Sequence, residues 1–360
     1  MNHGTNHGTT SAAEHAAPPP ILPDQARHPV LRQLLQECAL QQPEYRGGLS
    51  SHLPMALIAL AGMGASEARL QAYAVEYSQR MSPLMSVTTP ATTPVADWRA
   101  LRGQIDGYPA LLAYFQHEVT QQGTDAVLRQ VLPELMPGVG AAAFHGLIRL
   151  AYGVLAQSDS EIAAGLAYFA ARYLDLGPLL PASGVAGGPD QQYLALAGKS
   201  PLLPPRDLIF ASMQDASHLP GFAAQVASVQ IDQTTMAELA RCALQLFNVE
   251  ANFVALHMVT SCHALRLLLP YFADPLVQAV PWLWQAHLAA FYAGKLGQQA
   301  RMVIAGVPNA GFDARQFAAH RAEDDHSIKM VFTCLQEAAH YGDPARAYQQ
   351  AAQRVCNSFG

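Results

Sequence analysis

One stretch near the C-terminal end of the chain, residues 321–340, combines charged side chains with an apolar helical pattern. Two acids, Asp324 and Asp325, precede His326, and Lys329 follows three residues later. Residues i and i+3 of an α-helix lie roughly 60° apart around its axis, so His326 and Lys329 can face the same side. A lysine that faces an apolar interior is costly unless it is paired or neutral. We therefore expect this stretch to carry chemistry, with the two acids at the start of a helix.

The remainder of the chain has the patterns of an all-α protein. Apolar residues recur with helical spacing in many segments, among them residues 53–63, 139–155 and 253–269. Strand signals are nearly absent, and residues 302–304 (Met-Val-Ile) form the only short β-like run. Apolar residues make up 51% of the chain and charged residues 13%, which suits a well-buried core. The sequence predicts an all-α fold with a single large multi-helix domain over residues 21–360.

Two segments have the composition of irregular structure. Residues 1–20 repeat Asn-His-Gly-Thr and then run through alanine and proline, as in a disordered leader. Residues 177–205 are rich in glycine and proline and are predicted to form one long loop, of the kind that can cover a site as a lid.

Composition also limits the partners that we expect. The net charge of -6 provides no basic surface for nucleic acid. The five cysteines include no C-x-x-C pair and indicate reduced thiols in a cytosol. No signal-peptide pattern begins the chain, and Arg, Gln, His or Pro interrupts each apolar run, so we expect no membrane span. We predict a soluble, cytoplasmic protein that acts on a small molecule and binds neither nucleic acid nor a membrane; its oligomeric state is left open.

Several common catalytic motifs are missing or incomplete. Residues 117–121 begin like the H-E-x-x-H zinc motif, but glutamine occupies the position of the second histidine. The chain has no G-x-S-x-G, P-loop or G-x-G-x-x-G motif. Two Glu-x-x-His pairs, Glu323/His326 and Glu337/His340, resemble half-sites of di-iron bundles. They fall on one predicted helix, so they cannot face each other across a bundle.

Histidines that interrupt apolar helices are the strongest candidates for a site. His145, His257 and His326 do so, and His52 stands at the start of a predicted helix. A single buried histidine is more often a hydrogen-bonded core residue than a ligand. Four of them on separate helices favour a metal site, and neutral imidazoles suit Fe, Zn, Cu or Ni.

A site made only of histidines lacks an anionic ligand, and no H-x-D or H-x-E motif supplies one. Lys329 can supply it if its amine adds CO2, because the resulting carbamate is an acid-like oxygen ligand. This would also remove the buried ammonium. The alternative is that Lys329 pairs with Asp325 or Glu323 at the surface.

Four segments, in this order, resemble the questin oxidase-like family: Ser51-His52-Leu-Pro-Met-Ala-Leu, Phe144-His145-Gly-Leu-Ile-Arg-Leu-Ala-Tyr152-Gly153, Leu256-His257-Met-Val-Thr260 and Asp324-Asp325-His326-Ser-Ile-Lys329. The resemblance extends from about residue 28 to about residue 345. Fungal members of this family oxidatively open anthraquinone-type rings, and bacterial relatives are known. Gly146, Arg149 and Ala151 depart from the family pattern, and Arg149 stands where a second histidine is usual. We expect this arginine to alter the pocket.

The resemblance implies a mononuclear non-haem Fe(II) site held by four histidines and a carboxylated lysine. Carried over position by position, the ligands become His52, His145, His257, His326 and Lys329. His263 is an alternative to His257. It lies six residues further on, about 120° around the helix, so a regular helix does not readily aim both at one ion.

The implied activity is that of an O2-dependent oxygenase acting on a cyclic ketone or hydroxylated aromatic, by Baeyer–Villiger-type insertion or C–C bond cleavage. Asp324 and Asp325 are the expected catalytic residues, since either can hold a ligand imidazole in its tautomer. Both can also stabilise a helix N-terminus. We expect pocket walls from the aromatic residues Tyr152, Trp284 and Tyr292.

Two other functions stay open at this point. The chain fits a non-catalytic helical module that binds a hydrophobic ligand, its histidines being only hydrogen-bonded. It also fits an NADPH-dependent Baeyer–Villiger monooxygenase, although no glycine-rich nucleotide fingerprint supports that function.

Overall fold

The computed structural model describes residues 22, 29–81, 95–183, 187–199, 201–298, 313, 317, 323–343 and 346–358. Over these residues the chain is mainly helical, which confirms the all-α prediction. The strands of this part of the chain, β1 (Glu44–Tyr45) and β2 (Leu49–Ser50), form one short antiparallel hairpin. The predicted leader at residues 1–20 and the β-like run at residues 302–304 lie outside the described residues.

The α-helices account for most of the described residues. In chain order they are α1 (Pro29–Ala39), α2 (Leu53–Gly62), α3 (Glu67–Met81), α4 (Tyr108–Gln122), α5 (Thr124–Leu135), α6 (His145–Ala156), α7 (Asp159–Ala171), α8 (Pro189–Ala195), α9 (Ile209–Ser217), α10 (Phe222–Val226), α11 (Thr235–Val249), α12 (Phe253–Leu268), α13 (Pro275–Gln278), α14 (Val280–Ala293), α16 (Asp325–Tyr341) and α17 (Ala347–Ser358).

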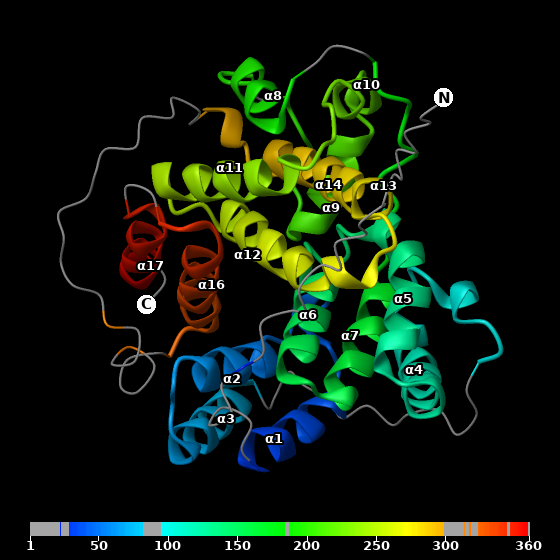
Figure 1. Ribbon diagram of the computed structural model, residues 1–360, viewed down its shortest axis with the longest axis vertical. Coiled ribbons are helices and arrows are strands. Elements are labelled where there is room, and N and C mark those ends of the chain that lie inside the picture. The colour runs from blue at the N-terminus through cyan, green and yellow to red at the C-terminus, as the bar shows by residue number, and fades with distance from the viewer. Residues whose placement is uncertain are drawn as a thin grey trace, which may run out of the picture.

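Four of these helices form a closed ring of neighbours. α2 packs against α6 and α16, and α12 also packs against α6 and α16. Figure 1 shows α12 crossing the middle of the molecule, with α16 and α17 to one side of it and α6 to the other. The remaining helices surround this ring, with α7 and α4 outside α6, and α11 and α14 beside α12.

The central position of α12 explains its composition. Every residue from Val254 to Leu268 is buried, so this helix is surrounded by protein on all sides. Contrary to the expectation that every apolar run is too short, residues Phe253–Tyr271 are long and apolar enough to cross a membrane by length and composition. However, 78% of that window is buried inside the protein, as in the core helix of a soluble protein.

Close contact between α6 and α7 depends on two glycines. A Cβ atom on Gly146 would lie 2.7 Å from Cα of Phe169, and one on Gly165 would lie 2.6 Å from Cα of Leu150. Both distances are too short for real contacts between carbon atoms, so only glycine allows this approach. Gly146, one of the departures from the family pattern, therefore sets the distance between the two helices.

Two predicted boundaries are wrong. The segment at residues 177–205 is not one loop, because α8 (Pro189–Ala195) interrupts it. The helix predicted over residues 139–155 begins only at His145. Ala142, Ala143 and Phe144 have φ angles of 47°, 54° and 73°, in the left-handed region that side chains disfavour. Apolar periodicity does not reveal such a turn, because all three residues are buried in the core.

Candidate metal centre

The first histidine, His52, is held by its backbone where the chain enters α2. It is the N-cap residue of that helix, directly after the β1–β2 hairpin. Its backbone N–H donates to the hydroxyl of Tyr77 on α3, 3.0 Å away. Two residues before His52, the hydroxyl of Ser50 lies 2.7 Å from the hydroxyl of Tyr168 on α7. The entry to α2 is therefore attached to two other helices, and His52 is 5% exposed.

His145 is positioned by the left-handed turn that precedes it. It is the first residue of α6, and its Nδ1 lies 2.5 Å from the carbonyl oxygen of Ala142. A carbonyl can only accept, so Nδ1 carries the proton of this bond. Each left-handed residue costs about 1–2 kcal/mol, and such strain is often found at functional sites. The turn at residues 142–144 therefore orients the ring of His145 at a cost to stability.

His257 is fixed from within α12. Its Nδ1 lies 2.7 Å from the carbonyl oxygen of Phe253, one turn earlier, so this nitrogen also carries a proton. His263 faces elsewhere, because its Nδ1 lies 2.7 Å from Oε1 of Glu337. Arg266 donates to the same oxygen from Nε at 2.8 Å and Nη2 at 2.6 Å. Of the two candidates on α12, His257 thus joins the other histidines, and His263 belongs to a separate buried ion-pair cluster.

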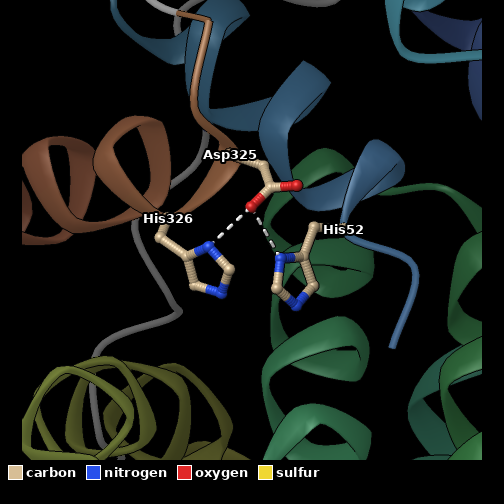
Figure 2. Close-up of side chains that lie close together, drawn as sticks. All are labelled: His52, Asp325 and His326. Atoms are coloured by element: carbon tan, nitrogen blue, oxygen red, sulfur yellow. Dashed lines mark hydrogen bonds and ion pairs between the residues drawn. The ribbon is translucent and has the colours of Figure 1, made fainter. Parts of the chain in front are cut away.

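The two acids at the start of α16 have different roles. Asp324 is the N-cap, and its Oδ1 accepts from the backbone N–H of Ser327 at 2.7 Å. Oδ1 of Asp325 lies 2.9 Å from Nδ1 of His52 and 2.8 Å from Nδ1 of His326. Figure 2 shows one carboxylate above two imidazoles, whose other nitrogens both point away from it. Asp325 therefore orients two rings, and Asp324 stabilises the helix end that carries one of them.

The Nε2 atoms of the histidines face one another. Nε2 of His145 lies 2.7 Å from Nε2 of His52 and 3.3 Å from Nε2 of His257. Nε2 of His326 is buried and has no hydrogen-bond partner among the described residues. The ring centroids of His257 and His326 are 5.8 Å apart, and those of His52 and His326 are 4.4 Å apart. The ring of four helices thus brings one histidine from each helix to a common point.

Lys329 lies beside these rings and is 1% exposed, so the alternative of a surface ion pair is wrong. Burial lowers the pKa of Lys329 to about 8, although the charges of Asp325 and Asp324 act in the opposite direction. A positive charge on Lys329 would in turn lower the pKa of His52, His145 and His257. The amine is therefore close to three of the histidines and is neutral more often than an ordinary lysine.

Burial keeps the imidazoles of His52, His145 and His257 neutral. It lowers the pKa of His52 to about 3 and holds the pKa of His145 and His257 well below the usual value. For Asp325, burial favours the neutral acid, but the neighbouring His52 and His326 hold the pKa of its carboxyl well below the usual range. The anionic carboxylate of Asp325 accepts a hydrogen bond from the Nδ1–H group of each of these two rings. The Nε2 atoms of His52, His145 and His257 then carry lone pairs and no protons.

A second, smaller set of side chains, on the Nδ1 side of the rings, is also close enough together to hold a metal ion. Single ligand atoms of His52, Asp325 and His326 all lie within 4.8 Å of one another. An ion there would compete with Asp325 for the Nδ1 atoms and would leave the Nε2 atoms of His145 and His257 without a role. The Nε2 side uses all four histidines and keeps the hydrogen bonds of Asp325. It is the better place for a cation.

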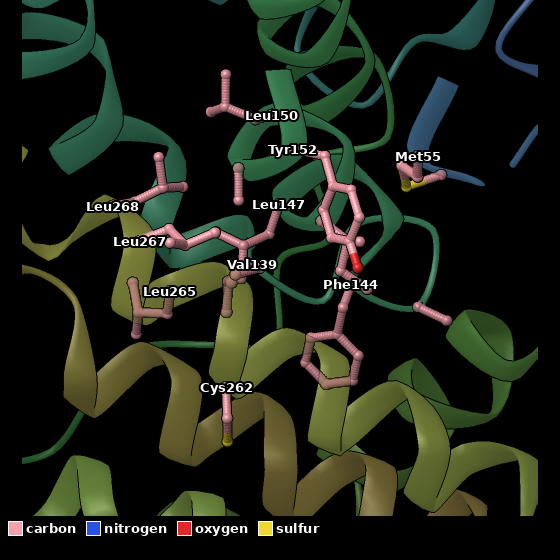
Figure 3. Packing of buried hydrophobic residues seen from close by; sticks show 14 of the residues in the cluster. Met55, Val139, Phe144, Leu147, Leu150, Tyr152, Cys262, Leu265, Leu267 and Leu268 are labelled. Carbon is pink, nitrogen blue, oxygen red and sulfur yellow. The ribbon is translucent and has the colours of Figure 1, made fainter. Parts of the chain in front are cut away.

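The surroundings of the centre are apolar and tightly packed. Figure 3 shows Phe144 and Leu147 in the layer between α6 and α12, opposite Cys262 and Leu265. Phe144, Leu147 and Leu265 are fully buried. This layer is part of the buried core on which α6 and α12 pack.

Arg149 does not face the histidines, contrary to the expectation that it alters the pocket. Its Nε and Nη2 donate to the two carboxylate oxygens of Glu161 on α7, at 2.9 Å and 3.1 Å, and both side chains are buried. The pair neutralises the arginine between α6 and α7. The sequence contained no sign of this partner, because Glu161 is in the first turn of α7, where acids are common.

The three aromatic candidates for pocket walls lie in different places. The Tyr152 hydroxyl is 3.5 Å from the backbone oxygen of Lys329 and 3.4 Å from Oγ1 of Thr333, so it contacts α16. Trp284 donates to the carbonyl of Val226, and the Tyr292 hydroxyl donates to Gln225. These two polar groups face α10, away from the histidines. Sequence reasoning missed Phe253, whose ring lies 4.7 Å from that of His257 and 4.6 Å from that of His326.

Comparison with known proteins gives one result that bears on this site. A family model described as questin oxidase-like matches residues 49–334, which include all four histidines and Lys329. A search of curated proteins found no match.

Proposed function

The chain belongs to the questin oxidase-like family, whose description points to an oxidase-type enzyme, and from this premise we propose that it is an iron-dependent oxygenase. Its substrate would be a cyclic ketone or a hydroxylated aromatic. The reaction would be a Baeyer–Villiger-type insertion or a C–C bond cleavage, with O2 as co-substrate. Insertion of a single oxygen atom also needs two electrons, for which NADPH is the candidate donor. Cleavage that incorporates both oxygen atoms needs none.

One observation carries the proposal: lone-pair-bearing Nε2 atoms lie 2.7 Å and 3.3 Å apart in a buried place. Two such nitrogens repel each other unless a cation lies between them. Two adjacent ligands of one octahedral ion lie about 3.0 Å apart when each is ~2.1 Å from the metal. The two Nε2–Nε2 distances, from His145 to His52 and from His145 to His257, lie on either side of 3.0 Å. These three nitrogens are therefore spaced as ligands of one metal ion would be.

The donor set also has the supports that metal-bound histidines need. In metalloproteins the second ring nitrogen usually donates to a carboxylate or a backbone carbonyl, which fixes the tautomer. Here the carboxylate of Asp325 accepts from Nδ1 of His52 and of His326. The carbonyls of Ala142 and Phe253 accept from Nδ1 of His145 and of His257, respectively. His52, His145, His257 and His326 would hold the ion through Nε2.

Lys329 would supply the fifth ligand as a carbamate. Addition of CO2 needs a neutral amine, and the lowered pKa of Lys329, about 8, makes that form available near neutral pH. The carbamate would replace a buried ammonium by an anion that faces a cation, which relieves the electrostatic cost of either charge alone.

Bound Fe(II) would supply a site for O2 and a Lewis acid for a deprotonated substrate oxygen. The chain would do the rest. Each of the helices α2, α6, α12 and α16 presents its N-terminal end near the histidines, and these ends favour negative charge on a substrate oxygen. Asp325 would hold two protons at fixed atoms, the Nδ1 atoms of His52 and His326. The buried layer around Phe144 would exclude water.

The test is the metal content of protein purified without oxygen. About one equivalent of iron per chain is expected, lost in His326→Ala and retained in a control, His117→Ala, whose residue is exposed on α4. Metal no higher in the natural chain than in His326→Ala would contradict the proposal and favour a non-catalytic binding module.

A further inference from the structure

The turn directly before His145 contains three consecutive residues with left-handed backbone, none of which is glycine. Ala142, Ala143 and Phe144 have φ angles of 47°, 54° and 73°. Elsewhere in the described part of the chain, non-glycine residues with positive φ occur singly. This conformation is unfavourable for any residue with a Cβ atom, and especially for a bulky one such as Phe144. The turn therefore persists only if other interactions hold it.

The local sequence does not favour this turn. Glycine adopts a left-handed backbone without strain, but Gly138 and Gly140, which precede the turn, do not have positive φ angles. A Cβ atom on Gly138 would overlap the ring of Tyr173, so this glycine allows close packing instead. Alanine, which occupies residues 141–143, is the residue that most favours the right-handed helix. The sequence thus favours a longer α6 that begins before His145.

The ring of His145 holds the turn in its left-handed form. Its Nδ1 donates to the carbonyl oxygen of Ala142 at 2.5 Å, and its backbone N–H donates to the same oxygen at 3.3 Å. Its Nε2 faces Nε2 of His52 at 2.7 Å and Nε2 of His257 at 3.3 Å. A cation at Nε2 would make Nδ1–H a stronger donor, because charge-assisted hydrogen bonds are stronger than neutral ones. Metal binding and the left-handed turn therefore stabilise each other through one imidazole.

We propose that residues 142–144 form a metal-coupled switch. The turn is left-handed when a cation binds Nε2 of His145; without a cation it becomes right-handed, lengthens α6 and moves His145 away from His52. The arrangement described above, with the histidines facing one another, corresponds to the metal-bound state. This inference rests on the metal centre of the proposed function, but not on its oxygen chemistry. Since coupling is reciprocal, a change that favours the left-handed turn must also tighten metal binding.

Glycine substitutions test this coupling. Ala142→Gly, Ala143→Gly and the double variant ease the left-handed turn and disfavour the helix that would replace it. Ala141→Gly is the matched control, because Ala141 adjoins the turn and is also buried but does not have a positive φ. Competition with a calibrated chelator measures the affinity of each chain for Zn²⁺ and, without oxygen, for Fe(II). Crystal structures of the chelator-treated and Zn²⁺-loaded natural chain show the turn directly.

We expect each single variant to bind metal about fivefold more tightly than the natural chain, and the double variant about 25-fold. Fivefold corresponds to about 1 kcal/mol, the lower end of the cost of one left-handed residue. Ala141→Gly should change the affinity less than twofold. In the chelator-treated crystal, residues 142–144 should be right-handed and His145 should lie away from His52.

Two results would overturn the switch and leave the metal centre intact. One is equal metal affinity of the natural chain and the Ala142 and Ala143 variants, and the other is an unchanged left-handed turn in the chelator-treated crystal. Zn²⁺ affinities that follow the expected order, in a chain that holds no iron when purified without oxygen, would overturn the iron oxygenase and support the switch. Metal binding by none of the chains would overturn both.

Discussion

Nε2 of His52 lies 2.7 Å from Nε2 of His145, although the Nδ1 atom of each ring already has an oxygen partner. With both protons on Nδ1, the two lone pairs face each other, and the proposed cation would make this arrangement favourable. Burial also prevents either ring from taking up a proton near neutral pH, since the pKa of His52 is about 3 and that of His145 is well below its usual value. Without a bound cation, this arrangement of neutral imidazoles would therefore destabilise the folded chain.

Metal binding should stabilise the folded protein strongly. At a free metal concentration 100 times Kd, the gain in unfolding free energy is about 2.7 kcal/mol. We expect removal of metal by a chelator under anaerobic conditions to lower Tm by several degrees, and re-addition of Fe(II) to restore it. Differential scanning calorimetry measures this. In His145→Ala the chelator should no longer change Tm; an equal shift in that variant would show that the metal binds elsewhere.

Changing Asp325 or Asp324 to asparagine should affect metal affinity differently. Asp325→Asn removes the anion that holds the protons of two imidazoles, and loss of such a support typically lowers metal affinity by about 10- to 100-fold. Asp324→Asn keeps an N-cap side chain, so it should change stability by less than about 1 kcal/mol and leave metal affinity unchanged. Competition with a calibrated chelator measures both affinities. Equal losses in the two variants would refute this division of roles between Asp325 and Asp324.

The sequence alone predicts which histidines belong to this centre, but not the carboxylate and carbonyl groups that hydrogen-bond to them. Helical spacing predicted that His326 and Lys329 share one face of a helix, and the separation of six residues predicted that only one of His257 and His263 joins the site. The contacts of the two rings in the structure, not the spacing, identify His257. The ligand set came from the family resemblance, and its assembly depends on packing of four helices that no local pattern encodes. Asp325 could be placed near His326 but not near His52, which is at the other end of the chain.

Two errors have the same physical origin. The left-handed turn at residues 142–144 is apolar and buried, so hydrophobic periodicity continues through it and hides the start of α6. Arg149 looked like a pocket residue because it interrupts an apolar helix. Its partner, Glu161, lies on a neighbouring helix and was inconspicuous among the acids of a first turn. The hydrophobic pattern of one segment predicts which residues are buried, but it does not predict the partner of a buried charge on another helix.

Lys329 should be replaceable by a small carboxylate from solution. Lys329→Ala leaves a gap where the carbamate would bind, so we expect it to bind metal at least tenfold more weakly than the natural chain. Acetate or propionate at millimolar concentration should restore part of that affinity. Lys329→Arg fills the space with a cation that cannot form the carbamate, and should not be rescued.

A direct observation of the carbamate complements this rescue. Metal-loaded protein prepared in ¹³C-labelled bicarbonate should show one carbamate carbon signal by NMR when a diamagnetic ion such as Zn²⁺ replaces iron. The signal should be absent from Lys329→Ala. Its persistence there would assign the modified amine to another residue.

Glu337 should be important for stability and dispensable for metal binding. Its Oε1 accepts from Arg266 and from His263 on α12, and all three side chains are buried. Loss of one partner from a buried ion pair costs about 3–5 kcal/mol. We expect this loss in unfolding free energy for Glu337→Ala by urea denaturation, while Glu118→Ala, at a half-buried surface site on α4, should change it by less than about 0.5 kcal/mol. Folded Glu337→Ala that has lost its metal would link this cluster to the centre.

His287 should make the protein less stable in acid, independently of any metal. It is fully buried, its Nε2 lies 2.9 Å from the Ser261 hydroxyl, and burial lowers its pKa to about 3. The unfolded chain binds a proton at this residue below pH ~6.5, whereas the folded chain does so only near pH 3. The stability that results is therefore complete above pH ~6.5 and is lost as the pH falls toward 3. Between pH 7.5 and pH 5.0 the loss is about 2 kcal/mol for this residue.

Comparison with His287→Gln isolates this contribution from those of the other buried histidines. Glutamine can still hydrogen-bond to Ser261 but does not titrate. Urea denaturation of chelator-treated protein at the two pH values should therefore show a smaller decrease in unfolding free energy for the variant, by about 2 kcal/mol. His287→Leu provides a second non-titrating side chain if glutamine perturbs the packing against Phe144. Parallel pH profiles for the natural chain and both variants would mean that His287 takes up its proton in the folded state as readily as in the unfolded chain.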